Sequence, residues 1–362
     1  MKERLKNDLI KLMKIPGLSG YEDRVRRFLQ KELALLGLKT QTDRLGNLMT
    51  SFSGNGPCVM LFAHMDQLGF VVRKIEKDGF ILVERLGGVP EKALPSQEVL
   101  ILVEKGPDVR GLIANKSHHA TTQSEKYQVS PYKDLYIDVG LKDFDEVKKA
   151  GINVGSPVVF APKSFEIGHD RVAGTSIDDR AGCAVALEIA RHLSKRTEGP
   201  KLHLVFTVQE EFNLRGALPI AQNLLPDIAI QLDLIMATDT PDMGERGDVN
   251  LGEGPAMSLF SFHSRGTLNG VIPHPKLVAL FEQTSLELKI PLQRSAHSGA
   301  LTDLSYVQLV GDGVASIDLG FPMRYSHSSL EVCDLNDLVG LTQLLIGALN
   351  KITPGFSLGR SS

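Results

Sequence analysis

The sequence of 362 residues has few cysteines, little net charge and no long apolar run. Its three cysteines, Cys58, Cys183 and Cys333, lie far apart and form no CxxC pair, which argues against a disulfide framework or a cysteine-ligated structural zinc. The net charge of −3, from 43 acidic and 40 basic residues, argues against a general nucleic-acid or membrane surface. No apolar stretch approaches the ~18–20 residues of a membrane span. We therefore expect a cytoplasmic protein without a nucleic-acid or membrane partner.

The N-terminus also lacks the continuous apolar stretch of a signal peptide. Instead, Leu5, Leu9, Leu12 and Met13 recur at helical spacing, with Lys and Arg on the other face. This pattern favours a helix docked on the protein over an amphipathic membrane anchor. A second helix is predicted after the loop that follows, and Ser19 is its expected N-cap.

The chain shows an α/β pattern that is interrupted once. The apolar run from Cys58 to His64 is typical of a strand covered on both faces. From Gly69 to about Pro162, short β-rich segments separated by Gly, Pro and Asp predict a small all-β unit. Beyond Ile167, helical and strand patterns alternate again. We therefore predict an α/β fold whose open mixed-sheet catalytic domain, residues 1–67 and 165–362, carries an inserted β-barrel domain, residues 68–164.

Acidic and imidazole side chains follow the predicted buried strands. In open α/β sheets, sites form beyond the carboxyl ends of the strands. The residues found there, or at the start of a helix in "SIDDRAG", are His64, Asp66, Asp178, Asp179, Glu210, Glu211, Asp233 and His327. Each alone has an ordinary structural explanation, such as helix capping by the Asp-Asp pair. Together they predict one site.

Several acids and two histidines cannot share a pocket without a cation, because like charges repel and burial penalises ionisation. Two divalent ions would compensate them. Carboxylate and imidazole ligands suit zinc, cobalt or manganese, and one shared carboxylate can bridge two ions ~3.5–4 Å apart. In the adjacent pair Glu210 and Glu211, one glutamate could then bind metal while the other acts as a base.

Five motifs resemble those of the tetrahedral (TET) metallo-aminopeptidases, which include glutamyl aminopeptidases and proteins once labelled cellulase M. They are "AHMDQLGF", "SIDDRAG", "VQEEFNLRGA", "ATDTP" and "RYSHSSLEV", and the resemblance covers nearly the whole chain. It implies a zinc-peptidase-like fold in which His64 binds one ion, Asp66 orients it, and Asp178 bridges both ions. Glu210 would be the general base. Glu211, Asp233 and His327 would complete the ligand set.

The resemblance also implies an activity and an assembly. The enzyme would hydrolyse N-terminal residues from short peptides, with a metal-bridging water whose proton Glu210 takes and then returns to the leaving amine. The chains would pair through the inserted domain and close into hollow tetrahedral dodecamers that admit small peptides.

Four positions depart from the family pattern. Gln67 stands where Glu is usual, Ser329 where Pro is usual, and Asp242 where Gly is common. The usual Gly-Thr-Asp segment is here "ALTD", which ends at Asp303. None of these changes removes a ligand. They bear on side-chain specificity and on activity toward standard substrates.

The sequence leaves some roles and alternatives open. His118 and His119 could reach the substrate or lie on a surface loop, His297 could line the cleft, and Cys183 is expected in a helix core. A related di-metal deacylase or carboxypeptidase would use the same ligands. A glycosidase would give no role to the histidines, and a decayed scaffold is disfavoured because every ligand is present. The preferred N-terminal residue, the native metal and the assembly state are not fixed by the sequence.

Overall fold

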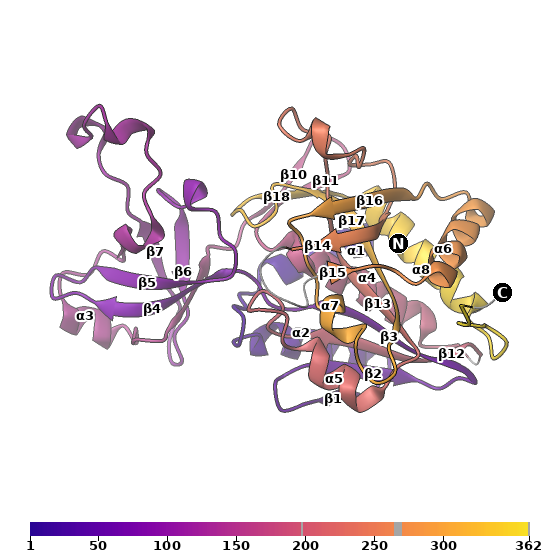
Figure 1. Cartoon of the computed structure of the whole chain (residues 1–362). Helices are drawn as coiled ribbons and strands as arrows, with labels where there is room; N and C mark the ends of the chain where they lie inside the picture. Colours follow the sequence, from indigo (N-terminus) through magenta and orange to yellow (C-terminus); the bar gives the residue numbers. More distant parts are fainter. Residues whose placement is uncertain (197, 264–269, 361–362) are drawn as a thin grey trace.

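The computed structural model describes residues 1–196, 198–263 and 270–360. It contains a large α/β body and a smaller β-barrel that lies to one side of it (Figure 1). The chain leaves the large body after strand β3 (Gly56–His64), builds the barrel, and returns with β10 (Ser164–Ile167). The predicted fold class, an open mixed α/β sheet with an inserted all-β barrel, is confirmed.

Among the described residues, the large sheet has twelve strands, and its centre is parallel. Strands β12 (Pro200–Thr207), β3, β13 (Ile228–Met236) and β17 (Ala315–Arg324) lie side by side and run in the same direction. The other strands are β1 (Thr40–Thr42), β2 (Leu48–Phe52), β10, β11 (Arg171–Gly174), β14 (Ala256–Phe262), β15 (Gly270–Val271), β16 (Gln293–Ser298) and β18 (Glu331–Asp334). Because the central strands are parallel, their carboxyl ends meet at one edge of the sheet.

Helices cover both faces of this sheet. Val59, Leu61 and Ala63 of β3 point into the larger core, whereas Met60 and Phe62 point into a second core on the opposite face. The larger core is formed with α1 (Lys2–Met13), α2 (Asp23–Leu35), α4 (Ile177–Leu193), α6 (Pro275–Leu288) and α8 (Leu335–Lys351); the second core includes α5 (Ala217–Leu224) and α7 (Leu304–Val307). Burial on both faces explains the continuous apolar run of β3. Among the described helices, none is both long enough and apolar enough to cross a lipid bilayer.

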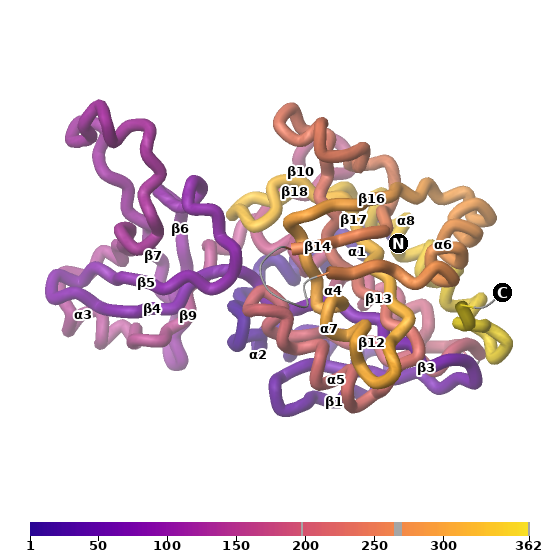
Figure 2. The backbone as a smooth tube through the Cα atoms, viewed as in Figure 1, coloured from indigo at the N-terminus to yellow at the C-terminus, as the bar shows by residue number. Residues whose placement is uncertain are grey.

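The barrel is closed by six strands in the order β4-β5-β8-β7-β6-β9. They are β4 (Gly69–Ile75), β5 (Ile81–Leu86), β6 (Glu98–Ile101), β7 (Val109–Ile113), β8 (Ile137–Asp138) and β9 (Pro157–Phe160), with helix α3 (Phe144–Lys149) before β9. Phe70 and Phe160 pack edge to face inside it, with ring centroids 6.2 Å apart. The segment between β7 and β8 extends away from the barrel (Figure 2).

The barrel contacts the large body near the start of α2. Arg24 of α2 forms a bidentate pair with Asp108 of the barrel, with nitrogen–oxygen distances of 2.5 and 2.9 Å. Leu18 lies buried in a small apolar cluster with Leu102 and Val159 of the barrel. These contacts combine a charged pair with apolar packing, and they fix the barrel beside the sheet edge.

The expected N-cap role of Ser19 is wrong. Helix α2 begins at Asp23, and the residue at its N-cap is Glu22. The hydroxyl of Ser19 instead donates a hydrogen bond of 2.5 Å to Asp66 Oδ2. The hydroxyl of Ser19 therefore bonds to a buried carboxylate from a distant part of the chain and not to the backbone at the start of the helix.

Candidate metal centre

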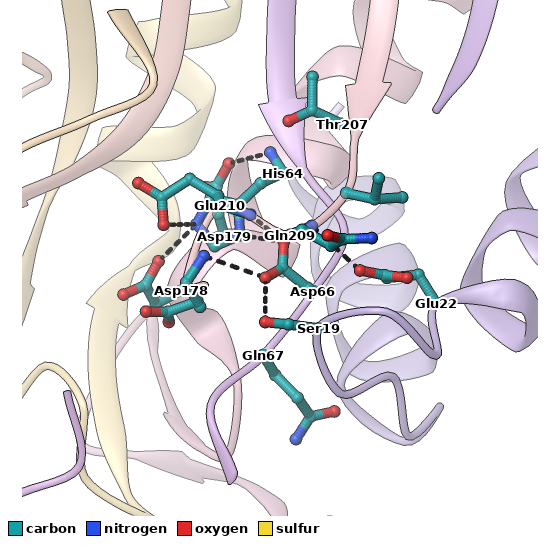
Figure 3. Close-up of polar contacts among 12 residues, drawn as sticks. Ser19, Glu22, His64, Asp66, Gln67, Asp178, Asp179, Thr207, Gln209 and Glu210 are labelled. Carbon is teal, nitrogen blue, oxygen red and sulfur yellow. Dashed lines mark hydrogen bonds and ion pairs between the residues drawn. The ribbon is translucent and has the colours of Figure 1, made fainter. Parts of the chain in front are cut away.

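The carboxyl edge of the parallel strands gathers the predicted site residues. His64 is the last residue of β3, Glu210 and Glu211 follow β12, and Asp233 lies near the end of β13. Asp178 comes from the start of α4, where the Asp178–Asp179 peptide bond is cis. His327 lies in the loop between β17 and β18. Figure 3 shows how several of these side chains face one another.

Three of the residues form a deeply buried group, which we call the inner group. His64, Asp178 and Asp233 each offer a ligand atom, and these atoms all lie within 4.8 Å of one another. His64 Nε2 lies 3.0 Å from Asp178 Oδ1. The exposed fractions of the three residues are 1%, 5% and 6%. This spacing is close enough for one ion to contact all three side chains.

A second group, which we call the outer group, shares Asp178. It consists of Asp178, Glu211 and His327, whose ligand atoms again lie within 4.8 Å of one another. His327 Nε2 lies 3.6 Å from Asp178 Oδ2 and 3.7 Å from Glu211 Oε2. Asp178 thus presents one carboxylate oxygen to the histidine of each group, because Oδ1 faces His64 and Oδ2 faces His327.

Asp66 connects the strand ends behind the inner group. It is fully buried, and its Oδ1 accepts a hydrogen bond from the backbone N–H of Glu210 at 3.0 Å. Its Oδ2 accepts bonds from the backbone of Glu211 at 3.0 Å and from Ser19 (Figure 3). Asp66 Oδ1 also lies 3.4 Å from His64 Nδ1. One carboxylate therefore orients both glutamates and the imidazole.

Glu331 is a residue of the site that sequence reasoning missed. It is 2% exposed, and its Oε2 accepts a hydrogen bond from the backbone of Asp178 at 3.1 Å. Its Oε1 accepts one from the backbone of His327 at 2.9 Å. Glu331 therefore links the shared carboxylate to the outer histidine. The one available signal was an acid within the apolar segment "SLEVC".

A backbone group of the inserted barrel also reaches the outer group. The carbonyl oxygen of Gly88 lies 3.1 Å from His327 Nδ1, so it can accept the hydrogen that this nitrogen carries. Such a bond leaves Nε2 free to bind a cation, because it fixes the tautomer of the imidazole. Gly88 also has little space for a side chain, since a Cβ there would lie 2.9 Å from the ring.

The acids of the site are crowded, and their pKa values reflect it. Burial raises the pKa of Glu210 and of Glu211 well above the usual range, and neighbouring carboxylates add to the rise. Burial and the charge of Asp178 raise the pKa of Asp233 to about 7. Burial lowers the pKa of His64, but the neighbouring carboxylates of Asp178 and Asp66 outweigh this effect and raise it well above 6.5. These groups need positive charge nearby.

The residues fit divalent cations. Two imidazoles and a set of carboxylates are ligands that zinc, cobalt and manganese accept. The oxygen Oε1 of Glu211 is buried and has no hydrogen-bond partner among the described residues, as expected of an atom reserved for a cation. A cation would also remove the penalty for ionising the crowded acids, because an opposite charge favours the charged form. Asp178 belongs to both groups.

Comparisons with known proteins agree with this geometry. The model of the M42 glutamyl aminopeptidase family matches residues 46–344. SgcX of Escherichia coli is 37% identical over 340 residues, which cover 93% of this chain and 91% of SgcX. The lysyl aminopeptidase of Pyrococcus furiosus is 30% identical and covers 95% of this chain and 96% of its own length. The chain belongs to the M42 family.

Solved structures support the same assignment. The aminopeptidase APDkam598 of the archaeon Desulfurococcus kamchatkensis superimposes with a TM-score of 0.91 at 33% identity, covering 98% of this chain and 97% of that one. The TET1 peptidase of Pyrococcus horikoshii gives a TM-score of 0.85 at 26% identity, covering 95% and 99%. The resemblance to TET aminopeptidases is confirmed, and this M42 chain is a metal-dependent aminopeptidase, a hydrolase.

The positions that depart from the family pattern occupy different places in the structure. Gln67 points away from them, and its Oε1 accepts bonds from Gly17 N at 3.0 Å and from Arg180 at 3.4 Å (Figure 3). Ser329 donates a hydrogen bond of 2.8 Å to Gln97 of the barrel. Asp242 accepts a bond from Thr240 on the surface. In the segment "ALTD", Ala300, Leu301 and Thr302 line the cleft, whereas Asp303 is buried behind them.

Other residues weighed in the sequence lie elsewhere. His118 and His119 are exposed on the segment that extends from the barrel. His297 is half-buried in β16 and is not among the residues that line the cleft. Cys183 is fully buried in the large core, as expected, and its thiol donates to the carbonyl oxygen of His64 at 3.1 Å.

Proposed function

We propose that this chain removes N-terminal residues from short peptides, with two divalent ions held by His64, Asp178, Glu211, Asp233 and His327. The observation that carries the proposal is the position of Asp178. Its two oxygens face the histidines of different groups, at 3.0 and 3.6 Å. A carboxylate in this position suits a bridge between two ions. Asp233 would complete the inner group and Glu211 the outer group.

Glu210 is the proposed general base. When bound, divalent ions supply positive charge that lowers the pKa of a water molecule and polarises the scissile carbonyl. Glu210 belongs to neither group of three, and its Oε2 lies 3.9 Å from His64 Nε2. From this position its carboxylate takes a proton from the attacking water and donates it to the leaving amine. Asp66 holds the backbone of Glu210 and faces the ring of His64, so it is proposed to position both.

The charge of the cleft favours an aminopeptidase. Asp178, Glu210, Glu211 and Asp233 all line it, and they attract the free amino group of a peptide. A deacylase or carboxypeptidase with the same ligands would act on substrates without a free amino group at this end. Neither has a specific observation in its favour here.

The finer assignments follow from the same family. Zinc is the proposed native metal, with cobalt and manganese as the alternatives to be compared. We propose that residues 68–164 form the assembly domain, through which the chain pairs and builds a tetrahedral dodecamer. The TET1 peptidase of Pyrococcus horikoshii can assemble into a tetrahedron or a large octahedral shell. Three free cysteines support a cytoplasmic location.

Metal analysis and turnover of one variant test the function. Wild type and Glu210→Gln are loaded with zinc, cobalt or manganese, and bound metal and hydrolysis of aminoacyl-p-nitroanilides are measured. Glu210→Gln is expected to keep both ions and to lose about 10²–10⁴-fold in kcat, which is the usual contribution of a general base. Glu104→Gln, an exposed glutamate of the barrel, serves as the control.

Two results would contradict the proposal. Full activity in Glu210→Gln would remove this residue from its role as base. Hydrolysis of N-acyl amino acids by the wild type, without hydrolysis of aminoacyl anilides, would replace the aminopeptidase by a deacylase.

A further inference from the structure

Outside the metal centre, the described residues that line the cleft are mostly uncharged. The cleft has a volume of about 550 Å³, and the acids that line it are the four of the metal centre. Away from the two groups, the described lining residues include no Asp, Glu, Lys or Arg, and His263 is the one further imidazole. The apolar part of this wall is formed by Leu214, Leu234, Met236, Ala300 and Leu301, with Tyr306 beside them. A substrate side chain beside these described residues therefore meets neutral atoms.

Leu301 has a fixed position in this wall. Its neighbour Thr302 donates a hydrogen bond of 2.8 Å to the buried Asp318 on β17. The backbone N–H of Leu304 donates to Gln231 Oε1 at 2.8 Å, and Gln231 Nε2 donates to Asp233 Oδ2 at 3.0 Å. The side-chain amide of Gln231 thus connects the backbone just after Leu301 to Asp233, a proposed ligand of the inner group.

A second buried acid holds the same segment from another strand. Thr207, the last residue of β12, donates to Asp303 Oδ2 at 3.4 Å, and Asp303 is 1% exposed. The segment that carries Leu301 is therefore anchored on β12, β13 and β17.

Neutral walls discriminate between charged and aliphatic side chains. An aliphatic side chain gains free energy when it leaves water for such a surface. A carboxylate or an ammonium group loses its hydration and finds no opposite charge among the described lining residues outside the metal centre. A glutamate side chain is further repelled by the acids of the cleft.

We propose that this wall selects peptides whose N-terminal residue is uncharged and aliphatic, of the size of leucine or methionine, over glutamate, lysine and arginine, and that Leu301 is a specificity-determining residue. The inference rests on the proposed aminopeptidase function and names its substrate class. It predicts a clear order among substrates and a change in that order when charge is introduced at position 301.

The test uses the full-length protein with its divalent ions. kcat/KM is measured on the p-nitroanilides of leucine, methionine, glutamate and lysine, and leucine and methionine are expected to exceed the other two by at least tenfold. Leu301→Arg should raise the ratio of glutamate to leucine turnover by at least tenfold, whereas Leu301→Asp should do the same for lysine. Leu301→Gly, which adds no charge, should weaken the discrimination several-fold. Leu286→Arg, at an exposed leucine of α6, should leave every ratio unchanged.

Binding supplies a second readout that does not depend on turnover. Calorimetry with the α-hydroxamates of leucine, glutamate and lysine should give the same order of affinity as the anilides. A wild type that prefers glutamate or lysine in both assays overturns the inference, and so do ratios that stay constant in all three Leu301 variants. If no anilide is hydrolysed but leucine hydroxamate still binds at least tenfold more tightly, the aminopeptidase function fails while this inference holds.

Discussion

The inner and outer groups share Asp178, but they differ in burial and in what holds their ligands. The side chain of His64 is 1% exposed, and its backbone belongs to β3, which is paired on both sides with β12 and β13. The side chain of His327 is 37% exposed, and its backbone lies in a loop with a φ of 65°. The inner group is therefore built by the sheet itself. The outer group depends on contacts that come from elsewhere.

Those contacts come in part from the inserted barrel. Gly88 O faces His327 Nδ1 at 3.1 Å, and Gln97 accepts a hydrogen bond from Ser329, two residues after His327. Glu331 adds a bond to the backbone of His327 from β18. A ligand held by a partly exposed loop loses more freedom when it binds an ion than one already fixed in a strand. The comparison therefore predicts an unequal pair of ions, with tighter binding in the inner group.

The largest effect is expected from removing each histidine. His327→Ala should keep one ion per chain at the inner group and lose the other, whereas His64→Ala should bind less than one ion and also be less stable, because it leaves buried acids without a partner. Affinity at the affected group should fall by more than the 10–100-fold that is typical of outer-shell partners. Metal content after equilibration with a competing chelator measures both.

The matched control is His169→Ala, which removes an exposed histidine. It should keep both ions and full stability. Loss of both ions in each variant would show that the two groups bind as one unit, and retention of one full ion by each would show equal affinities. Either result would contradict the proposed inequality.

A smaller effect concerns the acids that surround the inner group. Burial raises the pKa of Asp318 to about 7, while Thr302 donates to it. Between about pH 4 and pH 7 the folded chain holds a proton that the unfolded chain has released, so this group costs stability as the pH rises. Asp318→Asn keeps an acceptor for Thr302 and does not titrate. Its stability relative to wild type should therefore rise by about 2–3 kcal/mol between pH 5 and pH 8.

Chemical denaturation of both proteins at the two pH values checks this expectation. Asp312→Asn, at an exposed aspartate of the loop before β17, is the control. A stability difference that is constant from pH 5 to pH 8 would mean that Asp318 is ionised in the folded chain throughout this range.

Sequence reasoning predicted the architecture because its signals are local. The continuous apolar run of β3 and the Gly- and Pro-rich segments after Gly69 indicate a buried strand and a barrel whatever the rest of the chain does. The residues that meet at the sheet edge could be named because parallel strands place their carboxyl ends together, and the structure does bring all five proposed ligands into the two groups. Their roles as metal ligands remain predictions.

What could not be predicted are the partners of those residues. Ser19 meets Asp66 across 47 positions, Glu331 meets Asp178 across 153, and His327 meets Gly88 across 239. A serine before a helix has a local use as a cap, and a glycine in a loop has a local use in a turn. In each case the hydrogen-bond partner comes from a distant part of the chain. Which residues meet there depends on how the barrel and the sheet pack.

The smallest expected effect would show whether the barrel tunes the outer group. Ser329→Ala and Gln97→Ala each remove one end of the bond between the barrel and the loop of His327. Because the bond is neutral and partly buried, each variant should weaken binding of the outer ion several-fold, and the double variant should reveal a coupling of about 1 kcal/mol. The inner ion should be unaffected, and the control Gln128→Ala, at an exposed residue of the extended segment, should change neither affinity.

Calorimetric titration of metal into each variant measures the two affinities. Additive effects of the two substitutions would mean that the loop holds His327 without help from this contact, and the difference between the groups would then rest on Glu331 and Gly88.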